Sequence, residues 1–318
     1  MDNTRMNRFK FIKYLIKGSP IYFPGLDLKT REKRNLAVIK HFKQVKSPVY
    51  YVLGNHELKS KHGIDAINDY QDYKEWFMAF DRRYYYSWDQ DGYHFVALNS
   101  NENYSPVLTE IFSPKILTGG CFTFSADQLT WLSNDLAQTK KPTIVFTHIP
   151  LDDKSLSSYD IVNNAKQVRK IIYQSNKVLA VIQAHSHHMS APSLKGYTAR
   201  FKSIPYIYLP SFGSKVVGPR YSVVCVDTQQ NKIIIDTHKV AENWRRQRKI
   251  RIPNLDVSVP NLKPITFSVI NDIHYGPQRW DLYDEPEITN LLGQFVADTN
   301  EQQSTFVVVN GDWIDGHM

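Results

Sequence analysis

The 318-residue sequence is poor in cysteine and has no long apolar run. Cys121 and Cys225 are its only cysteines, which excludes a scaffold stapled by disulfides and a metal cluster bound by thiolates. Residues 1–20, MDNTRMNRFKFIKYLIKGSP, carry charges within every apolar stretch, so they do not read as a signal peptide. No segment approaches the roughly 18 consecutive apolar residues of a membrane helix. We therefore expect a cytoplasmic protein that does not bind membranes.

Acidic residues are also few relative to basic ones. Asp and Glu total 31 against 39 Lys and Arg, which gives a formal net charge of +8. This excess suits an anionic partner or substrate, but it also suits a surface that is merely soluble. Charged residues make up 22% and hydrophobic residues 42% of the chain, so wholesale disorder is excluded and a sizeable core can form. The sequence lacks a GxSxG elbow, a P-loop and a GxGxxG motif.

The spacing of apolar residues predicts alternating helices and strands. We expect helices over residues 6–17, 29–45, 126–138, 161–174 and 285–298. We expect strands over 49–53, 84–86, 94–98, 143–147, 178–183, 265–270 and 306–309, and a hairpin of 221–227 with 232–237. Residues 242–264 hold a cluster of five basic residues, at 245–251, and three prolines, which predicts a linker or surface connection.

Five of the predicted apolar strands end in polar residues that can bind metal. Functional groups in α/β sheets gather beyond the carboxyl ends of strands, where a buried strand holds its last residue rigidly. A single histidine at such a place is usually a satisfied polar residue, whereas the five ends together predict a metal site. The residues concerned are Asn55, His56, His148, His185, His187, Asp272, His274, Asp312 and Asp315.

These residues stand in blocks that resemble those of the calcineurin-like metallophosphoesterase family. The blocks are Asp272-Ile273-His274, Gly311-Asp312-Trp313-Ile314-Asp315, Gly54-Asn55-His56-Glu57, His148 and Ala184-His185-Ser186-His187. The stretches 128–132 and 145–150 are similar to the branch that contains cyclic-nucleotide phosphodiesterases and related phosphohydrolases. The resemblance implies an α+β fold, a four-layer α/β/β/α sandwich of two mixed sheets flanked by helices.

The sequence departs from the family pattern in two ways. The first two blocks come last, so the sequence looks circularly permuted: residues 1–241 correspond to the family's C-terminal part and 265–318 to its N-terminal part. Residues 242–264 would then be a linker that joins the old termini. We expect one domain over residues 1–318, because both ends of the chain must supply ligands to one site. The second departure is Ala184 in place of glycine, which would be costly if that position needs positive φ.

The resemblance implies two metal ions, with Mn, Fe or Zn suited to the nitrogen and oxygen ligands. One ion would take Asp272, His274 and His187, the other Asn55, His148 and His185, and Asp312 would bridge them. Water held between the two ions would attack phosphorus in line.

His56 and Asp315 are the expected catalytic residues. His56 would assist the leaving group, and Asp315 would orient it, although Asp315 alone also suits a loop cap. Glu57 is expected to be structural. Tyr275 and Arg279 are weaker candidates for contact with substrate.

The expected substrate is a small phosphate ester, either a diester or a monoester, with a nucleotide as one option. Two alternatives remain open at this point: a non-catalytic interaction module that keeps the fold, and a nuclease acting on polynucleotide. The sequence does not favour nucleic acid, and it predicts no oligomeric state.

Overall fold

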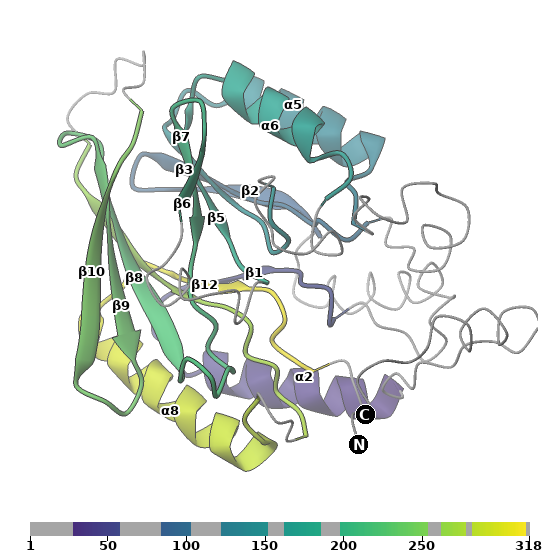
Figure 1. The fold of residues 1–318 in the computed structure, drawn as a ribbon, viewed down its shortest axis with the longest axis vertical. Helices are drawn as coiled ribbons and strands as arrows, with labels where there is room; N and C mark the ends of the chain where they lie inside the picture. Colours follow the sequence, from purple (N-terminus) through teal and green to yellow (C-terminus); the bar gives the residue numbers. More distant parts are fainter. Residues whose placement is uncertain are drawn as a thin grey trace, which may run out of the picture.

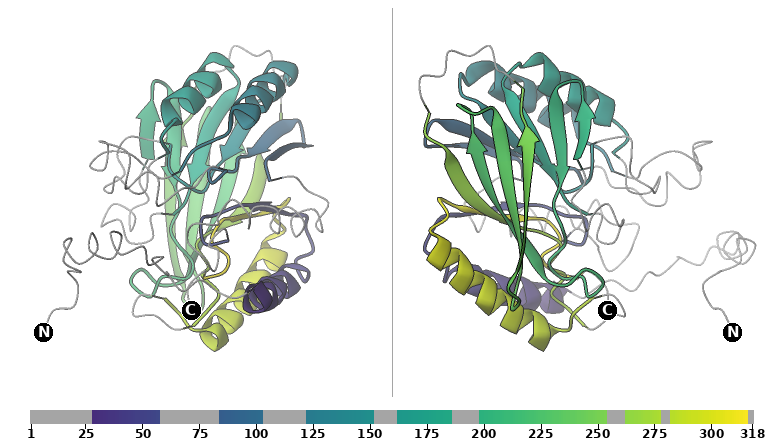
Figure 2. Two further views of the ribbon diagram at one scale, coloured as in Figure 1. Left: turned by 90° about the vertical axis from the view of Figure 1, so that its right-hand side faces the viewer. Right: turned by 60° about the vertical axis from the view of Figure 1, so that its left-hand side comes forward.

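The computed structural model describes residues 28–57, 84–102, 122–151, 162–185, 198–253, 262–277 and 282–315, with side chains from residue 33 onward. Within these ranges, two six-stranded sheets pack face to face, and helices cover the outer face of each sheet (Figure 1). The views in Figure 2 show the same four layers from other sides. The expected α+β sandwich of two mixed sheets flanked by helices is confirmed.

Sheet 1 joins segments from both ends of the chain. Its strand order is β1 (Val49–Val52), β12 (Val307–Asn310), β11 (Ile265–Ile270), β8 (Arg220–Asp227), β9 (Lys232–Lys239) and β10 (Trp244–Arg251). The first three strands are parallel, with Val49 opposite Val307, whereas β8, β9 and β10 are antiparallel. The predicted hairpin is therefore present as β8 and β9.

Sheet 2 comes from the middle of the chain. Its order is β2 (Tyr86–Gln90), β3 (Tyr93–Ala97), β4 (Thr143–Phe146), β5 (Val178–Gln183), β7 (Ile204–Tyr208) and β6 (Thr198–Phe201). The four central strands are parallel, and β2 and β6 are antiparallel edges. The central strands β3, β4, β5 and β7 are buried along their whole length, which explains their continuous apolar sequences.

Two helices cover each outer face within the described ranges. Helices α2 (Leu28–Phe42) and α8 (Glu285–Gln302) pack on sheet 1, and α5 (Ala126–Gln138) and α6 (Ala165–Gln174) pack on sheet 2. Ser125 caps α5 by accepting a hydrogen bond from the Gln128 amide, and Asp284 and Glu287 form a capping box at the start of α8. The expected helix over 126–138 has the bounds that the structure gives to α5.

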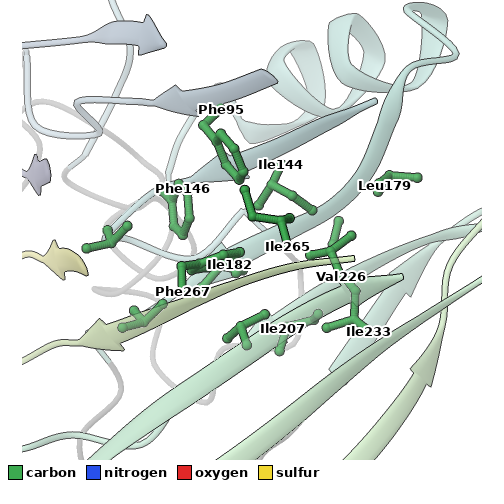
Figure 3. Close-up of a cluster of buried hydrophobic side chains, with 14 of the residues drawn as sticks. Phe95, Ile144, Phe146, Leu179, Ile182, Ile207, Val226, Ile233, Ile265 and Phe267 are labelled. Atoms are coloured by element: carbon green, nitrogen blue, oxygen red, sulfur yellow. The ribbon is translucent and has the colours of Figure 1, made fainter. Parts of the chain in front are cut away.

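The main core lies between the sheets and is rich in aromatic rings. Figure 3 shows Phe95 and Phe146 of sheet 2 facing Phe267 of sheet 1. Phe306 stacks on Phe267 with ring centroids 4.7 Å apart. Because this core takes side chains from both sheets, residues from both ends of the chain pack against its middle.

The structure corrects the sequence expectation over part of the proposed linker. Residues 244–251 form β10, a regular strand that pairs with β9 over eight positions. Its residues alternate between partly buried and exposed, and such a charged strand suits the edge of a sheet. Because most residues of this segment are charged, its sequence shows no alternation of apolar and polar residues that would indicate a strand. The first predicted strand of sheet 2 also shifts, from 84–86 to Tyr86–Gln90. The helix expected over 6–17 lies outside the described residues.

No helix of the described ranges combines the length and apolar character needed to cross a bilayer.

Candidate metal centre

The carboxyl ends of five strands meet at one edge of the sandwich. Strands β1, β12 and β11 of sheet 1 and strands β4 and β5 of sheet 2 end there, because each of these sheets is parallel at that place. The side chains that follow these strands are Asn55, His56, Asp312, Asp315, Asp272, His274, His148 and His185. All are buried except His185, which is partly buried.

Asp312 lies at the centre of this group. Its Oδ2 atom is 3.2 Å from His148 Nε2, 3.7 Å from His274 Nε2 and 3.9 Å from His56 Nε2. Two sets of side chains present possible ligand atoms within 4.8 Å of one another: His56, His274 and Asp312 in one, and His148, His185 and Asp312 in the other. Asp312 Oδ2 is buried yet accepts no well-formed hydrogen bond, which fits an oxygen that binds a cation. The donor set of carboxylate and imidazole suits Mn, Fe or Zn.

His148 is oriented by a backbone carbonyl. Its Nδ1 is 3.0 Å from the Asn310 carbonyl oxygen, so Nδ1 carries the proton and Nε2 faces the centre. Nε2 lies 3.2 Å from Asn55 Oδ1 and 4.0 Å from Asp272 Oδ1. Burial lowers the pKa of His148, but Asp312 and Asp272 outweigh it and raise the pKa to about 9. The negative charges around Nε2 therefore favour a cation at this position.

The backbone at the strand ends is strained. Ten non-glycine residues of the described ranges have positive φ, and four of them are predicted ligands: His185, Asp272, His274 and Asp312. A non-glycine residue in this region costs free energy, and such residues cluster at functional sites. The folded sandwich holds these four side chains in directions that an ordinary strand end would not give them.

Two glycines allow the ligand loops to approach one another. Gly311 has φ of 82°, and a Cβ there would lie 2.2 Å from His148 Nδ1. A Cβ at Gly54 would lie 2.2 Å from Asp312 Oδ1. The φ angle of Ala184 is not positive, so the alanine at this position avoids the cost that positive φ would bring.

Glu57 joins two of the motif blocks. Its Oε2 accepts hydrogen bonds from the Gly54 and Asp312 amides at 2.7 and 3.0 Å, and its Oε1 accepts one from the Ile314 amide at 3.3 Å. Burial, together with the charge of Asp312, raises the pKa of Glu57. This arrangement agrees with the structural role expected for Glu57, because one carboxylate fixes the loops after β1 and β12.

His56 and Asp315 are brought together as a pair. His56 Nδ1 is 3.1 Å from Asp315 Oδ1, and the His56 amide donates to Asp312 Oδ1 at 2.8 Å. The His56 side chain keeps 11% of its surface exposed, whereas Asp315 is fully buried. The centroid of the His56 ring lies 4.5 Å from that of the His274 ring, so His56 stands beside the centre.

Tyr275 is an expected residue that the structure turns away from the site. Tyr275 is buried in the cluster under α8, and its hydroxyl lies 3.2 Å from Thr289 Oγ1, so it does not line a crevice as expected. Tyr275 pairs with Ile314 through an isolated backbone bridge. His187 and Arg279 lie outside the described residues. Asp272 also differs: its Oδ1 accepts from the His185 amide, on the side of His148 rather than of His274.

Arg34, a residue of α2, supports the site although no sequence motif points to it. Its Nη1 donates to the Asp315 carbonyl at 3.1 Å, and its Nε pairs with Glu285 at 3.0 Å. The contact thus fixes the backbone that carries Asp315. No local pattern signals this role, because an arginine on a helix is ordinarily solvent-facing and its partners are over 250 residues away in the chain.

The fold and this cluster define a metal-dependent phosphoesterase. The sequence model of the calcineurin-like phosphoesterase family matches residues 25–189, slightly more than half of the chain. The chain belongs to this family of metallophosphoesterases. The matched region contains the blocks at Asn55, His148 and His185, and the blocks at Asp272 and Asp312 lie beyond it.

Comparison with solved structures finds a dimetal phosphatase from Danio rerio, which is 14% identical with a TM-score of 0.45. The alignment covers 64% of this chain and 72% of that chain. No curated protein matches the sequence.

Proposed function

We propose that this protein is a dinuclear metal-dependent phosphohydrolase that cleaves a small phosphodiester or phosphomonoester, with nucleotides as the first class to test. The observation that carries the proposal is Asp312, whose Oδ2 faces imidazoles of two separate groups. A carboxylate between two cation sites offsets part of their repulsion and sets them close to each other.

The ligand assignment that we propose follows the family pattern. His148, His185 and Asn55 would hold one ion, and His274, Asp272 and His187 the other, with Asp312 shared. Bound ions would supply activation of water and stabilisation of the charge that develops on the phosphate. The short approach of Asn55 Oδ1 to His148 Nε2 supports the first set. His56 also lies close enough to His274 and Asp312 to be a ligand of the second ion. Substitution of His56 distinguishes a metal ligand from a proton donor.

His56 is the proposed acid for the leaving oxygen. The Asp315 carboxylate accepts the Nδ1 proton, which leaves Nε2 as the atom that can donate to substrate. Asp315 is held in turn through its backbone by Arg34. The 11% of the His56 side chain that stays exposed supports this role, because a proton donor must meet the substrate.

The order of segments supports a circular permutation within the family. Strands β11 and β12 are parallel neighbours connected through α8, and β1 continues the same parallel order after α2. Trp313 Nε1 donates to Asn35 Oδ1, so the chain after β12 lies against α2. A link from the end of the chain to α2 would therefore produce two consecutive β-α-β units. We also place the protein nearest to the cyclic-nucleotide phosphodiesterase branch, on the stretches 128–132 and 145–150.

A rearranged chain tests the permutation. It would begin at residue 262, run through 318 directly into residue 1 and end at 253, and it should fold and retain phosphatase activity. The original chain, purified in parallel, is the control. Loss of folding in the rearranged chain would count against the permutation but not against the phosphohydrolase.

Hydrolysis assays test the function. The protein loaded with Mn²⁺ should hydrolyse bis(p-nitrophenyl) phosphate, p-nitrophenyl phosphate or a cyclic nucleotide. Asp312→Asn should lower kcat/KM by about 10³-fold or more and reduce the bound metal measured by mass spectrometry. His56→Ala should lower kcat by roughly 10²–10⁴-fold and retain both metals, as expected for the loss of an acid rather than a ligand.

His41→Ala is the matched control, because His41 lies near the end of α2 and away from the site. It should leave activity unchanged. Metal content near zero together with no hydrolysis after added Mn²⁺ would favour the non-catalytic module instead. Loss of metal in His56→Ala would make His56 a ligand and overturn its assignment as the acid.

A further inference from the structure

Three arginines interrupt the apolar face that sheet 1 turns toward sheet 2. Side chains on one face of a strand recur every second residue, and Ile250 of β10 belongs to the core between the sheets. Arg248 and Arg246 precede Ile250 by two and four residues and share its face. On β8, Arg220 precedes the core residue Val224 by four. The inner face of both strands therefore changes from apolar to cationic toward one end.

The three arginines form a row along the inner face of β10: Arg246 and Arg248 lie two and four residues after Trp244, and Arg220 reaches Trp244 from β8. Arg220 lies opposite Lys239 of β9, and Lys239 lies opposite Trp244 of β10. The Arg220 guanidinium lies 4.6 Å from the centre of the Trp244 ring, in a cation–π contact. Burial lowers the pKa of Arg220 and of Arg248, and the charge of Arg246 lowers both further. Arg246 therefore lies within electrostatic reach of both other arginines.

Arg220 and Arg248 lack a carboxylate partner within the described ranges. Arg220 is 8% exposed, and its buried Nε has no hydrogen-bond acceptor there. Arg248 donates to the neutral carbonyl of Tyr208 at 3.3 Å. The acidic residue that acts on Arg220 is Glu242, which is exposed and ion-paired with Lys239. Arg245, on the opposite face of β10, pairs with Asp236.

A buried cation without a counter-charge costs free energy unless an anion binds there. On the outer face of β10, Arg245 is paired with Asp236, whereas Arg220 and Arg248 of the inner row have no carboxylate partner within the described ranges. These two buried arginines are therefore where an anion would be stabilised.

The row begins, at Arg220, at the end of the sandwich that holds the candidate metal centre, and it runs along β10 to Arg248, which lies opposite Ile235. Strand β8 is antiparallel to β11, with Ser222 opposite Val269, so β8 begins where β11 reaches Asp272. Tyr208, the partner of Arg248, is three residues before Ser211, whose hydroxyl donates to the Asp272 carbonyl at 3.1 Å. Three residues of extended chain span at most about 10 Å. One small molecule can therefore approach both the arginine row and the metal centre.

We propose that Arg220, Arg246 and Arg248 bind a second phosphate group of the substrate while the metal centre receives the ester that is cleaved. Guanidinium groups match phosphate oxygens in geometry and charge, and a row of them favours phosphate over a neutral group. This inference rests on the proposed function and narrows its substrate class to phosphate esters with at least two phosphate groups.

A matched pair of substrates tests the inference. The p-nitrophenyl ester of thymidine 5′-phosphate is compared with the same ester that carries an added 3′-phosphate. Wild-type protein loaded with Mn²⁺ should prefer the second ester by about tenfold or more in kcat/KM, chiefly through KM. Arg246→Gln/Arg248→Gln should lose this preference. Arg245→Gln, a change of the same type on the outer face, should keep the preference. Equal preference in wild type and the double variant would overturn the proposal.

A binding measurement separates this inference from the hydrolytic function. In EDTA, thymidine 3′,5′-bisphosphate should bind wild-type protein and the Arg245→Gln variant with the same Kd, and the double variant at least tenfold more weakly. This result can be obtained even if no ester is hydrolysed, in which case only the proposed function fails. Arg248→Lys keeps the charge but not the guanidinium geometry, so it should bind the bisphosphate more weakly than wild type and more tightly than the double variant. If the double variant does not fold, the comparison is made between wild type and Arg248→Lys. A single-stranded oligonucleotide that binds the row more tightly than the bisphosphate would overturn the small-molecule assignment.

Discussion

The two halves of sheet 1 differ in strand direction, burial and chemistry. Strands β12 and β11 are parallel and almost wholly buried, and the side chains that can bind metal follow at their ends. Strands β8, β9 and β10 are antiparallel, and their residues alternate in burial. A strand covered on both faces can offer function only at its end, whereas an alternating strand can present side chains along its length. The metal centre and the arginine row follow from these two possibilities.

The largest expected change in stability comes from a substitution in the apolar half of sheet 1. Phe306 is fully buried before β12, and its ring stacks on Phe267 and meets Phe95 at 4.8 Å. Phe306→Ala should lower the free energy of unfolding by about 3–5 kcal/mol, because it opens a cavity between the sheets. Lys249→Ala, on the exposed face of β10, should change it by less than about 0.5 kcal/mol. Urea unfolding followed by circular dichroism measures both, and equal effects would contradict the contrast.

A substitution at a strand end should have a smaller effect on stability and should also reduce the bound metal. Gly311→Ala should destabilise by roughly 1–3 kcal/mol, because alanine is strained at φ of 82° and its Cβ meets the His148 ring. The displaced ring should also weaken metal retention. Gly293→Ala in α8 is the control: its Cβ meets nothing within 4 Å, so it should stabilise by up to about 1 kcal/mol. Thermal unfolding and metal content should move together in Gly311→Ala alone; unchanged metal content would show that Gly311 serves only the turn.

The smallest expected effect is a pH dependence in sheet 2, away from the metal centre. His94 lies 2.7 Å from Asp89 and 2.9 Å from Asp135 through its two ring nitrogens. Burial lowers the pKa of His94, but Asp135 and Asp89 outweigh it and raise the pKa above its ordinary value of 6.5. The stabilisation is therefore fully present below pH 6.5 and is lost as the pH rises through the raised pKa.

This contribution should be below about 1 kcal/mol, because solvent screens the partly exposed pairs. The free energy of unfolding of wild type minus that of His94→Gln should fall between pH 6 and pH 8. The subtraction cancels the other titrating groups. A difference that stays constant with pH would exclude the protonated imidazole as its source.

Sequence patterns located the strands whose periodicity is unambiguous. The strand bounds of β5 and β11 match the expected apolar runs, and α5 matches the expected helix, because burial there follows directly from residue type. The pattern failed at β10, where charge at the sheet edge resembles a linker. It also misplaced Tyr275, since the position after His274 gave no sign that the ring packs under α8.

By itself, the sequence determined which residue types follow the buried strands, and hence that nitrogen and oxygen ligands gather beyond their ends. Only the tertiary structure decided which of these side chains meet. Asp312 reaches His148, His274 and His56 because β1, β11 and β12 are neighbours in one sheet and β4 faces them from the other. Arg34 reaches the backbone of Asp315, and the arginine row reaches the same end of the sandwich, through contacts between segments far apart in the chain. Local periodicity reports burial on one element, whereas the distance between two side chains depends on how whole sheets pack.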